Sequence, residues 1–124
     1  MTLRRLEILQ WTGLLAGGAA WAFAHVFGYG LTLAQCNVGS AHWGISNDVW
    51  EGTLLSASAL LVLLAGSASA TVLLRTRETS YEDEPPLSRI RFLAIAAVIA
   101  NVIFLGIVLL DLAGNLSGVV CRQG

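Results

Sequence analysis

The sequence predicts an all-α integral membrane protein with three transmembrane helices, its N-terminus in the cytoplasm and its C-terminus outside. Three observations favour this fold class. First, 56% of the 124 residues are hydrophobic and only 12% are charged, against about 25% charged residues in soluble domains. Second, the charges are clustered, which leaves three uncharged apolar stretches long enough for the roughly 20 residues that cross a bilayer. Third, if each stretch crosses the membrane once, nearly all basic residues fall on the same side of it.

The three spans belong to a single domain, and we expect them at about residues 6–34, 49–74 and 90–112. The first is long enough to tilt or to protrude into the interface. Asp48 and Glu51 have the spacing of a capping pair that begins the second helix. Paired prolines, Pro85 and Pro86, interrupt the chain before the third helix. The stretch 113–118, which is rich in Gly, Asn and Ser, is typical of a turn.

The placement of the arginines predicts the orientation in the membrane. All basic residues are arginines, and all except Arg122 lie before the first span or between the second and third. The positive-inside rule makes that side cytoplasmic. Arginine in place of lysine, with much alanine, leucine and glycine, is typical of GC-rich bacteria. We therefore expect a multi-pass protein of a bacterial plasma membrane, in contact with lipids. The net charge of −1 argues against a nucleic-acid partner.

The two cysteines, Cys36 and Cys121, each follow an apolar span and fall on the predicted outer side. An oxidising compartment permits disulfides there. A Cys36–Cys121 bond would close a loop of about 85 residues and stabilise the fold by about 4 kcal/mol in the chain-entropy model. The alternative is two unpaired thiols near the membrane. We predict the disulfide as a structural clamp, because no CxxC motif points to redox or metal chemistry.

The two histidines, His25 and His42, are weak candidates for haem or metal binding. A b-type haem needs two axial ligands on facing elements, and only His25 lies on a predicted span. The alternative is a hydrogen bond of His25 inside a helix interface, with His42 at the lipid headgroups or on a partner. We expect no cofactor and no metal to be bound by this chain alone, and any haem or metal of a complex to lie on partner subunits.

Polar and small residues within the spans predict helix packing. Asn101 lies near the middle of the third span, where an amide normally hydrogen-bonds to a neighbouring helix; the alternative is a residue that lines a polar pathway. Small residues on the first span would let another helix approach closely. They are Gly13, Gly17, Ala20, Ala24 and Gly28. Small-residue faces recur on the other spans, so we expect some surface to remain for another subunit.

The sequence carries no catalytic motif, so a non-catalytic role is the first hypothesis for its function. We expect an accessory subunit of a multi-subunit bacterial membrane complex, a respiratory or other electron-transfer assembly, bound to larger membrane subunits. A possible outer docking surface combines Trp43, Trp50 and Asp111. One alternative is a small homo-oligomeric transporter or channel, in which His25, Asn101 or Asp111 would line a shared path. A second alternative is a haem-binding membrane subunit.

Overall fold

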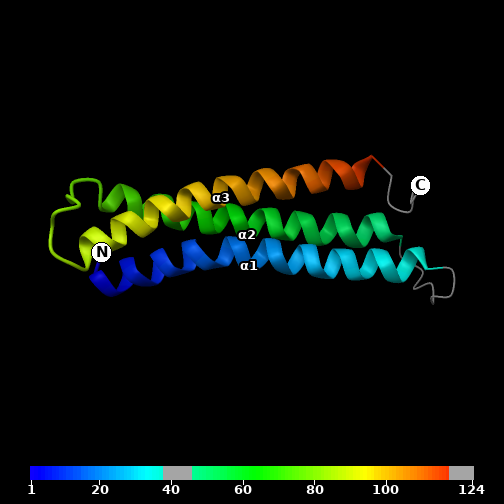
Figure 1. Ribbon diagram of the computed structural model, residues 1–124, viewed down its shortest axis with the longest axis horizontal. Helices are drawn as coiled ribbons and strands as arrows, with labels where there is room; N and C mark the ends of the chain where they lie inside the picture. The colour runs from blue at the N-terminus through cyan, green and yellow to red at the C-terminus, as the bar shows by residue number, and fades with distance from the viewer. Residues whose placement is uncertain (38–45, 118–124) are drawn as a thin grey trace.

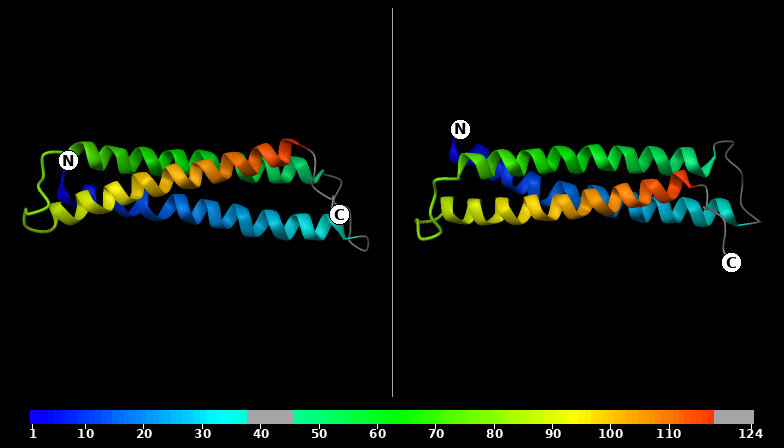
Figure 2. Two further views of the ribbon diagram at one scale, coloured as in Figure 1. Left: turned by 45° about the horizontal axis from the view of Figure 1, so that its top comes forward. Right: turned by 90° about the horizontal axis from the view of Figure 1, so that it is seen from above.

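The computed structural model describes residues 1–37 and 46–117. This part of the chain forms three helices, α1 (Leu3–Cys36), α2 (Asn47–Arg75) and α3 (Leu87–Leu116), which run up, down and up along one elongated bundle (Figure 1). Two further views show the N-terminus and the α2–α3 connection at the same end of the bundle (Figure 2). Each helix packs against both others. The all-α prediction is confirmed.

All three helices are long and apolar enough to cross a membrane. Even α2, with 29 residues, extends about 44 Å at 1.5 Å per residue, which exceeds the hydrocarbon core of about 30 Å. Only 17% to 28% of each most apolar segment is buried inside the bundle. Large apolar side chains therefore cover the outside, among them Leu64, Phe92, Val102 and Leu110. Lipid tails can solvate such a surface, so the three candidate spans indicate a multi-pass membrane protein.

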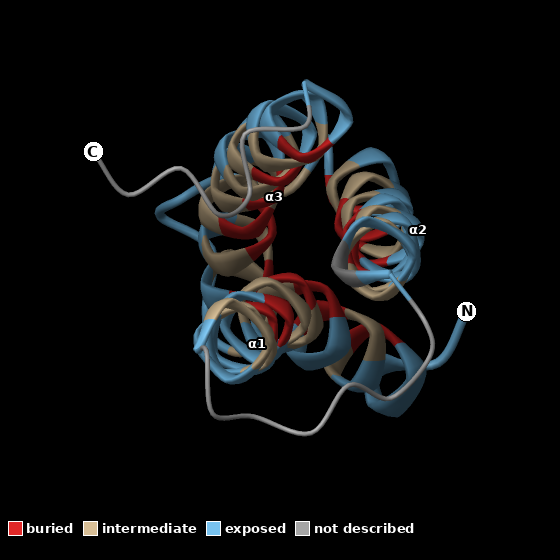
Figure 3. Ribbon diagram, turned by 90° about the vertical axis from the view of Figure 1, so that its right-hand side faces the viewer, coloured by how far each residue is buried: buried red, intermediate tan, exposed pale blue. Residues whose placement is uncertain are grey.

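The buried residues lie on the inward faces of the three helices, as the view along the bundle shows (Figure 3). At the end that holds the N-terminus, Leu6, Val72, Ile90 and Ala94 form a closely packed apolar cluster with one or more residues from each helix. Towards the middle, small residues replace the large ones, and the helices approach closely there. The core is therefore narrow. This is expected in a membrane, where lipid tails are as apolar as the side chains and helices associate by close packing of small residues.

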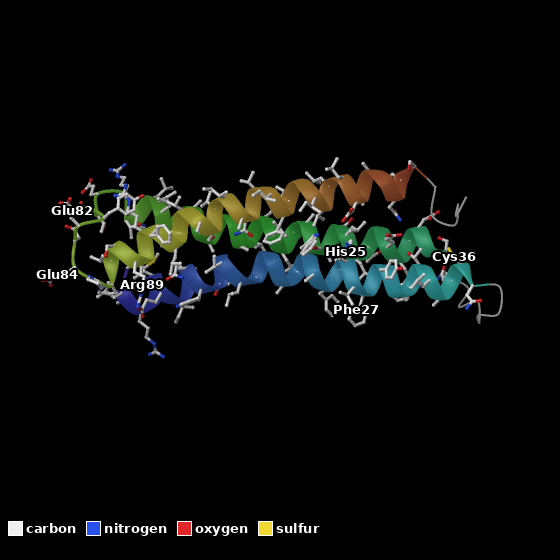
Figure 4. All side chains as sticks on the ribbon, in the orientation of Figure 1. His25, Phe27, Cys36, Glu82, Glu84 and Arg89 are labelled. Carbon is white, nitrogen blue, oxygen red and sulfur yellow. The ribbon has the colours of Figure 1, made fainter. Side chains whose placement is uncertain are left out.

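Six arginines lie at the end of the bundle that holds the N-terminus and the α2–α3 connection. They are Arg4, Arg5, Arg75, Arg77, Arg89 and Arg91. An ion pair of 3.2 Å joins the guanidinium of Arg89 to the carboxylate of Glu7, which links α3 to α1. Both side chains are substantially exposed, so this pair contributes less than about 1 kcal/mol. Figure 4 shows Arg89 together with Glu82 and Glu84 at this charged end.

Arg91 holds the connection between α2 and α3. Its guanidinium donates a hydrogen bond of 2.8 Å to the carbonyl oxygen of Arg77 and another to the carbonyl of Thr79. The same group lies 5.2 Å from the ring centroid of Tyr81, in cation–π geometry. One arginine thus satisfies two backbone acceptors of the connection that follows α2.

Two predictions about the helix ends are wrong. Asp48 does not cap α2, because the helix begins at Asn47 with Ser46 at the N-cap and no side-chain capping bond from it. Glu51 instead reaches Asn115 of α3. The predicted turn at 113–118 is helical as far as Leu116. The Gly and Asn residues in this stretch are compatible with a helix, and the contact of Asn115 with α2 favours the helical conformation over a local turn.

Candidate functional site

The end of the bundle opposite the arginines contains a pocket of about 360 Å³ between all three helices. It has two carboxylate side chains, Glu51 on α2 and Asp111 on α3. Other polar groups come from α1 and α3, and apolar residues complete the wall. The full lining consists of Ala24, His25, Gly28, Tyr29, Thr32, Glu51, Leu55, Leu110, Asp111, Gly114 and Asn115. We take this pocket as the candidate site and name it the outer pocket.

Glu51 and Asn115 join two helices at the outer pocket. The amide nitrogen of Asn115 donates a hydrogen bond of 3.3 Å to a carboxylate oxygen of Glu51. Gly52 makes room for this arrangement, because a Cβ at position 52 would lie only 3.3 Å from the amide oxygen of Asn115. Asn115 is 7% exposed. A nearly buried amide therefore orients one of the two carboxylates of the pocket.

His25 is held in the wall of the outer pocket by an aromatic stack. Its ring lies 5.5 Å from the ring of Trp21, with 25° between the planes. Trp21 in turn stacks at 5.5 Å on Phe104 of α3. His25 lies in the half of α1 that ends at Cys36 (Figure 4). The expected hydrogen bond of His25 in a helix interface is thus replaced in the structure by ring stacking beside a pocket.

Haem or metal binding by the histidines gains no support from these contacts. His42 lies outside the described residues, so the structure does not test its pairing with His25. Within residues 1–37 and 46–117, no group of three or more His, Cys, Asp or Glu side chains could hold a metal ion.

Asn101 lies at a junction of all three helices, away from the outer pocket. Its amide nitrogen donates hydrogen bonds of 2.7 Å to the carbonyl of Gly13 on α1 and of 2.8 Å to the carbonyl of Ala97. A Cβ added at Gly17 would lie 1.9 Å from the amide oxygen of Asn101, and a Cβ added at Gly66 would lie 3.5 Å from the Cβ of Asn101. Glycines on two helices therefore admit the amide of a third. The geometry is that of a packing contact between helices.

The small residues predicted to mediate packing lie mostly against the neighbouring helices. Gly13, Gly17, Ala24 and Gly28 are buried, while Ala20 is half-buried. A Cβ at Gly13 would meet the hydroxyl oxygen of Ser69 at 2.2 Å. This face of α1 is therefore used inside the bundle.

The predicted outer groups are only partly within the described residues. Cys36 ends α1 and is not a free thiol, but Cys121, the other cysteine of the chain, lies outside the described residues. The disulfide between them stays a prediction. Trp43 also lies outside them. Trp50 is half-buried on α2 and Asp111 lines the outer pocket, and the docking surface that combines them with Trp43 stays a prediction.

Sequence reasoning missed four polar residues of the outer pocket. They are Tyr29, Thr32, Glu51 and Asn115. A periodic signal was present for most of them. On α1, His25, Tyr29 and Thr32 follow the spacing i, i+4, i+7, and on α3 Asn115 follows Asp111 by four residues. Residues at these spacings share one face of a helix. Glu51 carried no such signal, because its spacing from Asp48 imitates a capping pair.

Comparison with known proteins does not assign this chain. No protein family, curated protein or solved structure matches it. The functional argument therefore depends on the geometry described above.

Proposed function

We propose that this chain is a non-catalytic accessory subunit of a multi-subunit complex in a bacterial plasma membrane, with a respiratory or other electron-transfer complex as its host. In this proposal the arginine-rich end lies in the cytoplasm and the outer pocket lies on the other side, as the positive-inside rule predicts. The larger membrane subunits carry any haem or metal, and this chain contributes packing surface.

One observation carries the proposal, a shallow groove of about 240 Å³ between α2 and α3. On α2 it is lined by three small residues, Gly66, Ser67 and Ala70, together with Val62 and Leu63. The opposite wall comes from Val98, Asn101, Val102 and Leu105 of α3. We name it the α2–α3 groove. Small residues let the backbone of another helix come close, and such approach favours helix association in membranes, where hydrophobicity alone does not.

The position of the groove along the bundle supports a transmembrane helix as its occupant. It lies beside Asn101, roughly half-way along α3 (Leu87–Leu116). The hydroxyl of Ser67 in the groove donates its hydrogen bond of 2.8 Å to the carbonyl of Leu64 within its own helix, so the groove offers an almost wholly apolar surface. An apolar helix of a larger subunit would match this surface.

Affinity purification of the tagged chain in mild detergent tests the proposal. We expect larger subunits to co-purify at fixed stoichiometry. The variant Ala70→Leu fills the groove and should release them, because the added side chain occupies the space of the partner helix. Ala57→Leu makes the same change at an exposed position of the same helix outside the groove and should retain them.

Two outcomes would contradict the accessory role. One is a stable homo-oligomer without any other chain, which would favour the transporter or channel instead. The other is full retention of the partner subunits by Ala70→Leu, which would show that the α2–α3 groove is not where they bind. An absorbance spectrum of the isolated chain distinguishes the haem alternative, because a Soret band would require a haem ligand on this chain.

A further inference from the structure

We draw no further inference here: the strongest candidate, the exposed stripe of hydroxyl side chains along one face of α2 (Thr53, Ser56, Ser67 and Thr71), carries nothing, because three of these hydroxyls already donate hydrogen bonds to carbonyl oxygens of their own helix and nothing in the described part of the chain shows what covers this face.

Discussion

Replacement of Gly17 by alanine probes the closest helix contact in the bundle. A Cβ at position 17 would lie 1.9 Å from the amide oxygen of Asn101, where real contacts are essentially never under 3.0 Å. The amide must therefore move away by about 1 Å or the helices must separate. Because the oxygen and nitrogen belong to one rigid amide, the movement also disrupts the bonds of 2.7 Å to Gly13 and 2.8 Å to Ala97.

These two effects set the expected magnitude. An overpacked core costs about 1–3 kcal/mol, and an interhelical hydrogen bond in a membrane contributes about 0.6 kcal/mol and at most about 1.7 kcal/mol. We expect Gly17→Ala to lower the free energy of unfolding by about 2–3 kcal/mol. Asn101→Ala alone should lower it by about 1–2 kcal/mol. In the double variant the clashing oxygen is absent, and the next neighbour of the new Cβ is the Cβ of Ala65 at an ordinary 3.7 Å.

A double-mutant cycle measured by SDS titration in mixed micelles, followed by circular dichroism, checks the reasoning. The double variant should be more stable than the sum of the single effects predicts, with a coupling of about 1.5 kcal/mol or more. Gly106→Ala is the matched control, because a Cβ there meets no described atom within 4 Å and alanine favours the helix by up to about 1 kcal/mol. Additive effects, or a Gly17→Ala variant as stable as the Gly106→Ala control, would refute the contact.

Three further predictions concern other features. Ser58 is 3% exposed and its hydroxyl has no hydrogen-bond partner among the described residues, so Ser58→Ala should raise the SDS midpoint of unfolding. Ser69→Ala removes a hydrogen bond of 2.9 Å to the carbonyl of Ala65 and should not raise it. Equal shifts of the two variants would contradict this. Thiol alkylation with mass analysis of the unreduced protein should find neither Cys36 nor Cys121 modified, and two modified thiols would exclude the disulfide. A cysteine introduced at Ser80 in the α2–α3 connection should react with a membrane-impermeant maleimide only after the cells are opened. Labelling in intact cells would show that the protein has the opposite orientation in the membrane.

The central packing contact shows how far local patterns reach. The spacing of Gly13 and Gly17 predicted a face for helix packing, and the position of Asn101 predicted a hydrogen bond to another helix. Both groups lie at the three-helix junction, yet no local pattern indicated that they meet each other. Their meeting depends on the rotation and the relative height of two helices, which the packing of all three decides together.

At the end of α3, by contrast, a local preference predicted the wrong conformation. Gly114, Asn115 and Ser117 are turn-forming residues by local preference, but the helix continues to Leu116. Tertiary contact outweighs that preference, because Asn115 finds a hydrogen-bond partner on α2 only if α3 extends past it.

The sequence by itself determined the number of helices, their approximate limits and the gathering of six arginines at one end, because each is a property of hydropathy and charge along one dimension. Only the tertiary structure decided which polar residues share a site. Glu51, Asp111, Asn115 and His25 come from three helices, and their meeting is set by helix register. Hydropathy carries no information about register, since a lipid-facing helix remains apolar on nearly every side.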